Sequence, residues 1–284
     1  MADRLRVTEL DFDTIKSNLK TFLNQQTEFT DYDFEGSGLS VLLDILAYNT
    51  HYNAYYLNMV ANESFLDTAL LRDSVVSHAK TLGYVPYSKK APIATINFLV
   101  NSGTSSASTL TIPSGYSFLS NKIDGKSYNF IVLNEVTSTK ANSSFYFENL
   151  SIYEGQLTTY SFTHNQANNP KQIFTLPDEN IDTTTIKVGV SPSVTNTAIS
   201  IYSKVTDILD ITSTSEVYYL QENRNGKFEI YFGNDVVGKK LPDGAVVSVT
   251  YLLTNGDVAN KANNFIATST LSDSLNESLT NFVI

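Results

Sequence analysis

The hydrophobic period of this chain changes near residue 85, and this change constrains the fold more than any other feature. Before that point, apolar residues recur at the spacing of an amphipathic helix. From residue 91 onward, apolar and polar residues alternate in short runs that end at Asn, Gly, Ser or Pro, as strands do. The sequence therefore predicts an α+β protein, with a bundle-forming helical region at residues 1–90 and a mainly antiparallel β-rich domain at residues 91–284.

The helical region should contain helices at residues 13–26, 39–62 and 65–82. Asp11 or Asp13 can cap the first helix and Ser37 the second, because short side chains that carry oxygen accept hydrogen bonds from the first free amides. Asp73 could cap a fresh start inside the third helix, and Gly83 should end that helix in the left-handed conformation.

The second predicted helix carries apolar and aromatic side chains around more than one face, which is typical of a helix buried between partners. Tyrosine is favoured at interfaces because it combines a large apolar area with a polar tip. A bundle within one chain and a bundle between subunits both stay open, so some of these side chains could be intrachain core. We expect a partner interface formed by Leu39, Leu42, Leu43, Leu46, Tyr52, Tyr55, Tyr56 and Met59.

Composition excludes several kinds of site. The chain has 19 Lys and Arg against 29 Asp and Glu, a net charge of −10, which argues against a nucleic-acid partner. It has no Cys and three scattered His, so neither a thiolate site nor a metal site is expected. We also expect no cofactor, no secretory signal and no membrane span. Only 17% of residues are charged, and a surface of Ser, Thr and Asn suits a protein packed against other subunits.

Turn residues organise the end of the β-rich region. Asn225 and Gly226 give the strongest hairpin signal in the chain. Downstream, residues 231–264 predict a hairpin-like β unit without a ligand, with a strand that ends at Phe232 and an alternating strand at 245–253. Its expected structural turns are Gly233, Gly238, Pro242 and Gly244, where the three glycines should adopt positive φ.

Two sets of motifs carry a family resemblance. Residues 232–235 (FGND), 242–244 (PDG) and 247–251 (VSVTY) resemble the signature of the baseplate J-like family of contractile phage tails. More specifically, the helical region resembles the baseplate wedge proteins of T-even-type phages at residues 29–37, 41–50, 63–65, 71–76 and 83–86. Members of that group are considerably longer, so the chain is expected to be a shortened relative or part of a longer protein.

The resemblance implies a structural subunit of the tail baseplate in the virion, assembled in the host cytoplasm and without enzymatic activity. Its helices would join a second copy of the chain and another wedge protein in a helical core bundle around the tail tube, next to a sheath-initiator-like subunit. The subunit would then transmit the conformational switch that triggers sheath contraction. Two alternatives remain, a β-rich receptor- or glycan-binding tail protein and a glycan-degrading enzyme.

Overall fold

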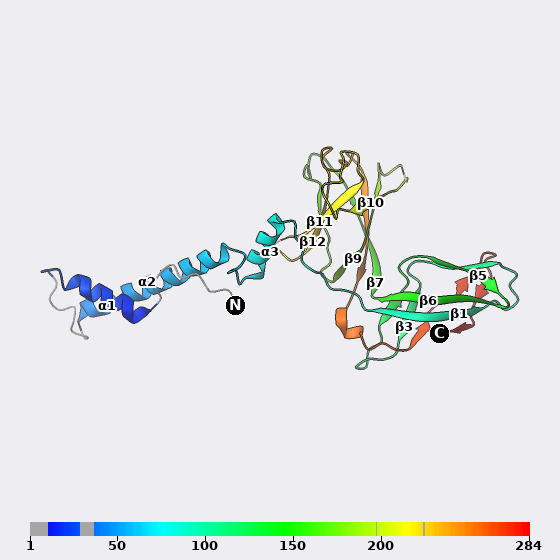
Figure 1. Cartoon of the computed structure of the whole chain (residues 1–284), viewed down its shortest axis with the longest axis horizontal. Coiled ribbons are helices and arrows are strands. Elements are labelled where there is room, and N and C mark those ends of the chain that lie inside the picture. The colour runs from blue at the N-terminus through cyan, green and yellow to red at the C-terminus, as the bar shows by residue number, and fades with distance from the viewer. Residues whose placement is uncertain (1–10, 29–36, 197, 224) are drawn as a thin grey trace. The chain divides into compact units, whose positions relative to one another are not determined.

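The computed structural model describes residues 11–28, 37–196, 198–223 and 225–284 (Figure 1). The chain divides into two compact units, Met1–Val85 and Pro86–Ile284. The first is helical and the second is built from β-sheets, so the predicted α+β class is confirmed. Most of the motif at residues 29–37 that carries part of the resemblance lies outside the described residues.

The helical unit contains α1 (Phe12–Leu23), α2 (Gly38–Glu63) and α3 (Arg72–Thr81). The predicted caps of the first two helices are confirmed. Asp11 accepts hydrogen bonds from the amides of Asp13 and Thr14, and the Ser37 hydroxyl accepts one from the amide of Ser40 at 3.0 Å. The α1 helix packs along α2 (Figure 1).

The third helix is shorter than the predicted range 65–82, because the chain turns between α2 and α3. The Glu63 carboxylate accepts hydrogen bonds from the amides of Leu70 and Leu71, at 2.9 and 3.2 Å. Amides held by this side chain are not available for a continuous helical ladder, so α3 starts at Arg72. Asp73 lies in its first turn rather than at the cap, and Gly83 has the predicted positive φ of 77°.

The β unit contains two main sheets. The first is an eight-stranded sheet in which β1 and β6 run antiparallel, from Ile93 opposite Tyr153 to Asn101 opposite Ser144. Its core is aromatic, with Phe98, Phe118, Phe130 and Phe145 almost fully buried. Its strands are β1 (Ile93–Asn101), β2 (Thr109–Ile112), β3 (Ser117–Ser120), β4 (Asn129–Ile131), β5 (Val136–Ala141), β6 (Ser144–Glu154), β14 (Phe265–Ala267) and β17 (Phe282–Val283).

The second sheet has seven strands in the order β7-β13-β9-β10-β11-β12-β8. Neighbouring strands in this sheet pair antiparallel, except that β10 and β11 run parallel to one another. Its strands are β7 (Gln156–Thr163), β8 (Ile173–Thr175), β9 (Ile181–Ser191), β10 (Ser200–Lys204), β11 (Val217–Glu222), β12 (Phe228–Phe232) and β13 (Val246–Leu253), and a small sheet pairs β15 (Leu271–Ser272) with β16 (Ser278–Leu279). The alternation of residues along β13 predicts that Val247, Val249 and Tyr251 face inward, and all three are fully buried.

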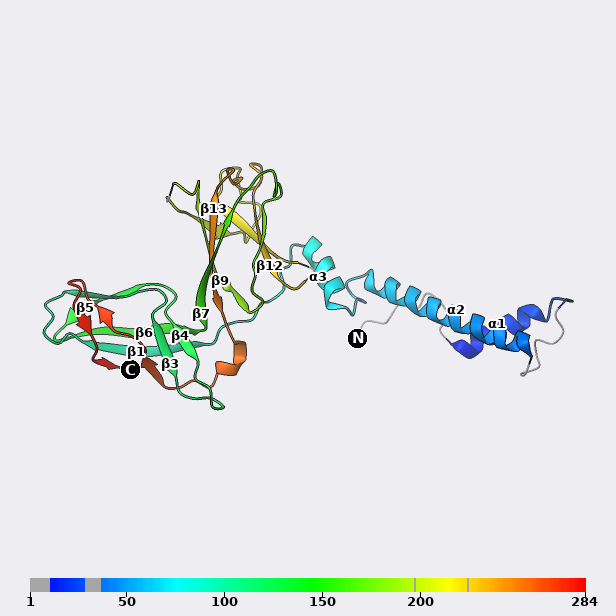
Figure 2. The ribbon, with the colours of Figure 1, turned by 180° about the vertical axis from the view of Figure 1, so that it is seen from behind.

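A single residue connects β6 of the first sheet to β7 of the second. The β6 strand ends at Glu154 and β7 begins at Gln156 (Figure 2). Gly155 lies between them with a φ of 129°. A Cβ at Gly155 would lie 2.1 Å from the carbonyl oxygen of Leu253. The chain can therefore pass from one sheet to the next only with glycine at this position.

The hairpin at Asn225-Gly226 is confirmed, because β11 and β12 are antiparallel neighbours and Gly226 has a φ of 75°. The hairpin-like unit predicted at residues 231–264 is wrong. The β12 strand pairs with β11 and β8, whereas β13 pairs with β7 and β9, so the two halves lie apart in the same sheet. As interior strands of the sheet, β12 and β13 each have both edges paired, whereas each strand of an isolated hairpin leaves one edge unpaired.

The predicted turns of this segment hold in part. Gly238 and Gly244 have positive φ values of 85° and 79°, and Pro242 accepts a hydrogen bond from the amide of Ala245. Gly233 does not have positive φ, so that prediction is wrong; the left-handed residue of the first turn is Asp235, at 66°. What requires glycine at 233 is close packing, since a Cβ there would lie 2.1 Å from the backbone of Gly238.

Candidate partner interface

The buried side of the α2 helix carries mostly small and polar side chains, and most of the large apolar side chains of the helix are exposed. One stripe along the helix is buried, and it consists of Ser40, Leu43, Ala47, Ala54, Asn58 and Asn62. Two of its side chains bond along the helix, because Asn58 donates to the carbonyl of Ala54 at 2.8 Å and Asn62 to that of Asn58. This distribution is the reverse of that of an ordinary surface helix, which places large apolar residues inward.

Most of the side chains predicted to face a partner are exposed in this unit. Between 40% and 57% of the surface is accessible for Leu42, Leu46, Tyr52, Tyr55, Tyr56 and Met59. Leu39 is half-buried. Leu43 is only 3% exposed, so it belongs to the interior of the helical unit and not to an outer face.

The exposed side chains contain a regular pattern that was not among the features predicted from the sequence. Along α2, large apolar or aromatic side chains are exposed at intervals of four and three residues in turn. They are Val41, Ile45, Tyr48, Tyr52, Tyr55 and Met59. We call these six residues the α2 seam. A spacing of this kind is the heptad repeat with which helices pack side by side. The signal was present in the sequence at Val41, Ile45 and Tyr48.

The tyrosines of the seam contact one another along the helix. The Tyr48 hydroxyl donates to the Tyr52 hydroxyl at 3.0 Å, and their ring centroids lie 4.6 Å apart. This hydrogen bond is the main reason why the pKa of Tyr52 is raised. Tyr52 in turn lies beside Tyr56, with centroids 6.3 Å apart. The three rings therefore form a row along the exposed side of α2.

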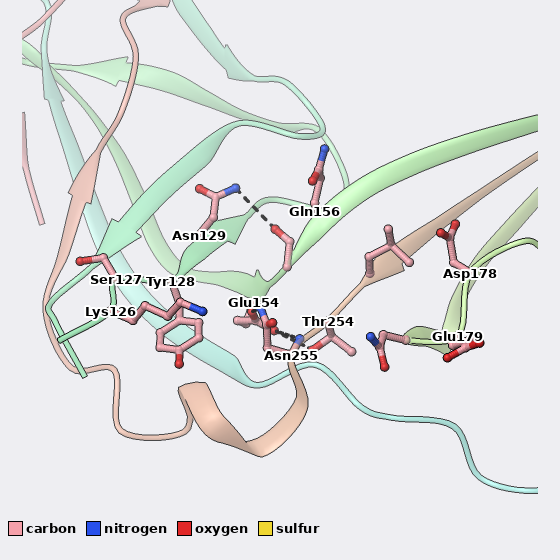
Figure 3. Close-up of a pocket in the computed structure, with 13 residues that line it drawn as sticks. Lys126, Ser127, Tyr128, Asn129, Glu154, Gln156, Asp178, Glu179, Thr254 and Asn255 are labelled. Atoms are coloured by element: carbon pink, nitrogen blue, oxygen red, sulfur yellow. Dashed lines mark hydrogen bonds between the residues drawn. The ribbon is translucent and has the colours of Figure 1, made fainter. Parts of the chain in front are cut away.

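The β unit has a polar cleft of about 450 Å³ where its two sheets meet (Figure 3). Glu154, which is 1% exposed, is one of the residues that line the cleft. Its carboxylate accepts hydrogen bonds from the Thr254 hydroxyl at 2.6 Å and from the backbone and side-chain amides of Asn255 at 3.0 and 2.7 Å. These bonds tie the end of β6 to the end of β13, so Glu154 serves as a strut between the sheets.

Nothing in this cleft is arranged for metal binding. Across the described ranges, no group of three or more His, Asp or Glu residues is placed to hold a metal ion. Nor does any helix among the described residues combine the length and apolar character needed to cross a membrane.

Two family models match the chain, and they match different units. The model described as "Baseplate wedge protein gp6-like, helical domain" matches residues 11–84, which contain α1, α2 and α3. The model described as "Bacteriophage baseplate wedge protein gp6, third domain" matches residues 160–254, from β7 to β13. The chain is also 34% identical to baseplate wedge protein gp6 of Enterobacteria phage T4, over 92% of its own length. The chain belongs to the gp6-like family of phage baseplate wedge proteins.

The family resemblance inferred from the sequence motifs is thereby confirmed. The chain spans 41% of the length of the phage T4 relative. Within the gp6-like helical domain, the α2 seam occupies the outward side of the longest helix. The strand VSVTY at residues 247–251 lies in β13, near the end of the matched third domain.

Proposed function

We propose that this chain is a structural subunit of a phage tail baseplate wedge, and that α2 is its assembly element. The observation that carries the proposal is the α2 seam, a row of six large apolar side chains that are exposed in the helical unit. Exposing such a row to water is unfavourable, at roughly 25 cal/mol per Å² of apolar surface. A helix with heptad spacing removes that surface from water by packing against further helices.

The proposed partners are a second copy of this chain and another wedge protein, which together complete a helical core bundle around the tail tube. Two features of α2 support the proposal that it packs against more than one partner helix. Leu42 and Leu46 lie exposed beside the seam rather than on it, so α2 has more than one apolar face to cover. A buried stripe already occupies the side of α2 that carries Leu43 and Ala47. We further propose that the bundle adjoins a sheath-initiator-like subunit.

The β unit serves in this proposal as a rigid spacer that moves as a body when the baseplate switches and the sheath contracts. Its support is the strut at Glu154, which fixes the two sheets to one another through three hydrogen bonds. The role requires packing and movement and no chemical step, so we assign the subunit no catalytic activity. We place it in the virion, in the tail baseplate, after assembly in the host cytoplasm.

The test replaces Ile45 and Tyr52 of the α2 seam with Asp in the full chain, produced together with the wedge protein of the same phage that it contacts. Burying two carboxylates in a helical interface is strongly unfavourable, so copurification should be lost. The matched control replaces Leu209 and Leu275 with Asp; both are exposed leucines of the β unit. Retention of the complex by the α2 variant, with helix content unchanged by circular dichroism, would refute the proposal.

A further inference from the structure

Among the described residues, no strand pairs with the outer edge of β7 in the second sheet. In this sheet, β7 is the terminal strand and pairs with β13 along its whole length, from Gln156 opposite Leu253 to Thr163 opposite Val246 (Figure 2). The strands at the other ends of the two main sheets are short, with three residues in β8, three in β14 and two in β17, against eight in β7. Short edge strands are a common protection against unwanted pairing, and β7 lacks this protection.

The phase of the hydrogen bonds shows which backbone groups of β7 face outward. The amide of His164 donates to the carbonyl of Ala245 at 2.7 Å, and the carbonyl of His164 accepts from Gly244 at 2.9 Å. Both groups of His164 therefore point toward β13. Because these directions alternate along an antiparallel strand, the amides and carbonyls of Thr163, Ser161 and Thr159 point away from β13. The side chains of all three residues are exposed.

The edge carries no charge that would repel an approaching strand. The sequence of β7 is QLTTYSFT, without Asp, Glu, Lys, Arg or Pro, and it is rich in β-branched and aromatic residues. Charged side chains and proline are the usual means by which edge strands prevent pairing. A second copy of the same strand would therefore meet no like charges along the edge.

We propose that β7 pairs antiparallel with the β7 of a second copy of this chain, which joins two seven-stranded sheets into one. The two copies would be related by a two-fold axis perpendicular to the sheet, so that each residue faces one on the same side of the strand. The axis passes beside Tyr160. This register places Thr159 opposite Ser161 of the partner subunit, and both residues have outward backbone groups. It is an interface separate from the α2 seam and does not depend on it.

The side chains fit this register. On the inner face, Tyr160 is 42% exposed although its ring lies only 4.7 Å from that of Phe162, so the edge leaves an aromatic surface uncovered. Pairing places Tyr160 against Tyr160 of the partner subunit and Thr158 against Phe162 of the partner subunit. Aromatic and β-branched pairs of this kind stabilise antiparallel strands. On the outer face, the hydroxyl groups of Thr159 and Ser161 of the partner subunit face one another, and Leu157 lies opposite Thr163 of the partner subunit.

Disulfide trapping tests the proposal directly, because the chain contains no Cys. In the proposed register Tyr160 forms a pair without hydrogen bonds, whose Cα atoms lie about 4.5 Å apart. That distance falls within the range of a disulfide, roughly 4.4–6.8 Å. The variant Tyr160→Cys, in the full chain under mild oxidation, should form a covalent dimer on a non-reducing gel. The matched control is Tyr146→Cys, because Tyr146 is 47% exposed and lies within the interior strand β6.

A second change asks whether the trapped dimer depends on backbone pairing. Thr159→Pro removes one outward amide from each subunit and leaves the hydrogen bonds to β13 intact. Because the two subunits are related by the two-fold axis, the dimer loses two hydrogen bonds between its subunits. Added to Tyr160→Cys, it should reduce trapping about thirtyfold, since two hydrogen bonds at about 1 kcal/mol each are lost. If the proline variant does not fold, Ser161→Lys replaces it and places two ammonium groups along the shared edge.

Two results would overturn the proposal. One is a yield of dimer from Tyr160→Cys no higher than that from Tyr146→Cys. The other is loss of trapping when Ile45→Asp and Tyr52→Asp are added to disrupt the α2 seam, because the dimer would then belong to the helices. Trapping that persists in this background supports the β7 interface whether or not the proposed role of α2 holds.

Discussion

Gly233 lies so close to Gly238 that a Cβ on Gly233 would stand 2.1 Å from both the carbonyl carbon and the carbonyl oxygen of Gly238. The turn between them is closed by the amide of Asp235, which donates to the carbonyl of Gly238 at 3.0 Å. Both glycines belong to the matched third domain. Their contact sets the path of the chain after β12 and leads to the first prediction.

Gly233→Ala should destabilise the β unit, because the clash involves backbone atoms that cannot rotate away. We expect the free energy of unfolding in urea to fall by about 2–3 kcal/mol. Gly244→Ala is the matched control. An added Cβ on Gly244 would meet no atom within 4 Å, so only the positive φ of 79° disfavours alanine there. This substitution should lower the free energy of unfolding by about 1–2 kcal/mol. Equal stability of the Gly233 variant and the unchanged protein would contradict the packing argument.

The same glycine shows how far the sequence could predict the fold. Turn residues predicted that the chain bends between Phe232 and Asp235, and the structure confirms the bend. The reason for glycine was wrong, since Gly233 avoids a contact with a residue five positions away rather than adopting positive φ. Contacts of this kind depend on tertiary packing, and local propensity does not report them.

The helices were predicted better than the strand partners. Asp11 and Ser37 cap as expected because capping depends on residues within one turn. The α3 helix began later than predicted, because the Glu63 side chain competes for backbone amides of the preceding segment. Of the predicted interface, Leu43 is buried, since periodicity alone cannot say which apolar face of a helix is already covered within the chain.

Glu154 should be important for the connection between the two sheets. Glu154→Ala leaves the Thr254 hydroxyl and two amides of Asn255 without their acceptor, so we expect a loss of about 2–4 kcal/mol in the free energy of unfolding. Glu154→Gln is the control, because the Asn255 side chain can rotate its amide to meet a carboxamide. We expect the Gln variant to recover at least half of that loss. A thermal shift equally large for both variants would show that charge, and not the hydrogen bonds, matters.

Glu63 should hold the corner between α2 and α3. In Glu63→Ala, the amides of Leu70 and Leu71 lose their acceptor and should exchange faster with solvent deuterium. The nearby exposed Asp67→Ala serves as the control and should leave those amides unchanged. Unaltered exchange at Leu70 and Leu71 in the Glu63 variant would argue that the corner is held by other contacts.

The same corner should be sensitive to acid. Hydrogen bonds from the Ser74 side chain and the Leu70 amide lower the pKa of Glu63 below its ordinary value of 4.5. A lowered pKa means that the contribution is complete above the unfolded value and is lost as the pH falls through the folded value. Protection of the Leu70 and Leu71 amides against exchange, relative to the intrinsic rate at each pH, should therefore fall in the unchanged protein as the pH drops below 4.5. In Glu63→Ala it should show no such additional step.

Tyr218 should make the β unit less stable in alkali. It lies in β11, is 3% exposed, and its burial raises its pKa to about 12. The unfolded state releases this proton near pH 10, so stability should fall as the pH rises from about 10 to 12, by about 1.4 kcal/mol per unit. Below pH 10 both states keep the proton and the contribution is constant. Tyr218→Phe should reduce the slope of unfolding free energy against pH by up to one proton, measured by urea denaturation. Tyr87→Phe, at a residue 82% exposed, controls for the loss of a phenol, and an identical reduction in both variants would refute the assignment to Tyr218.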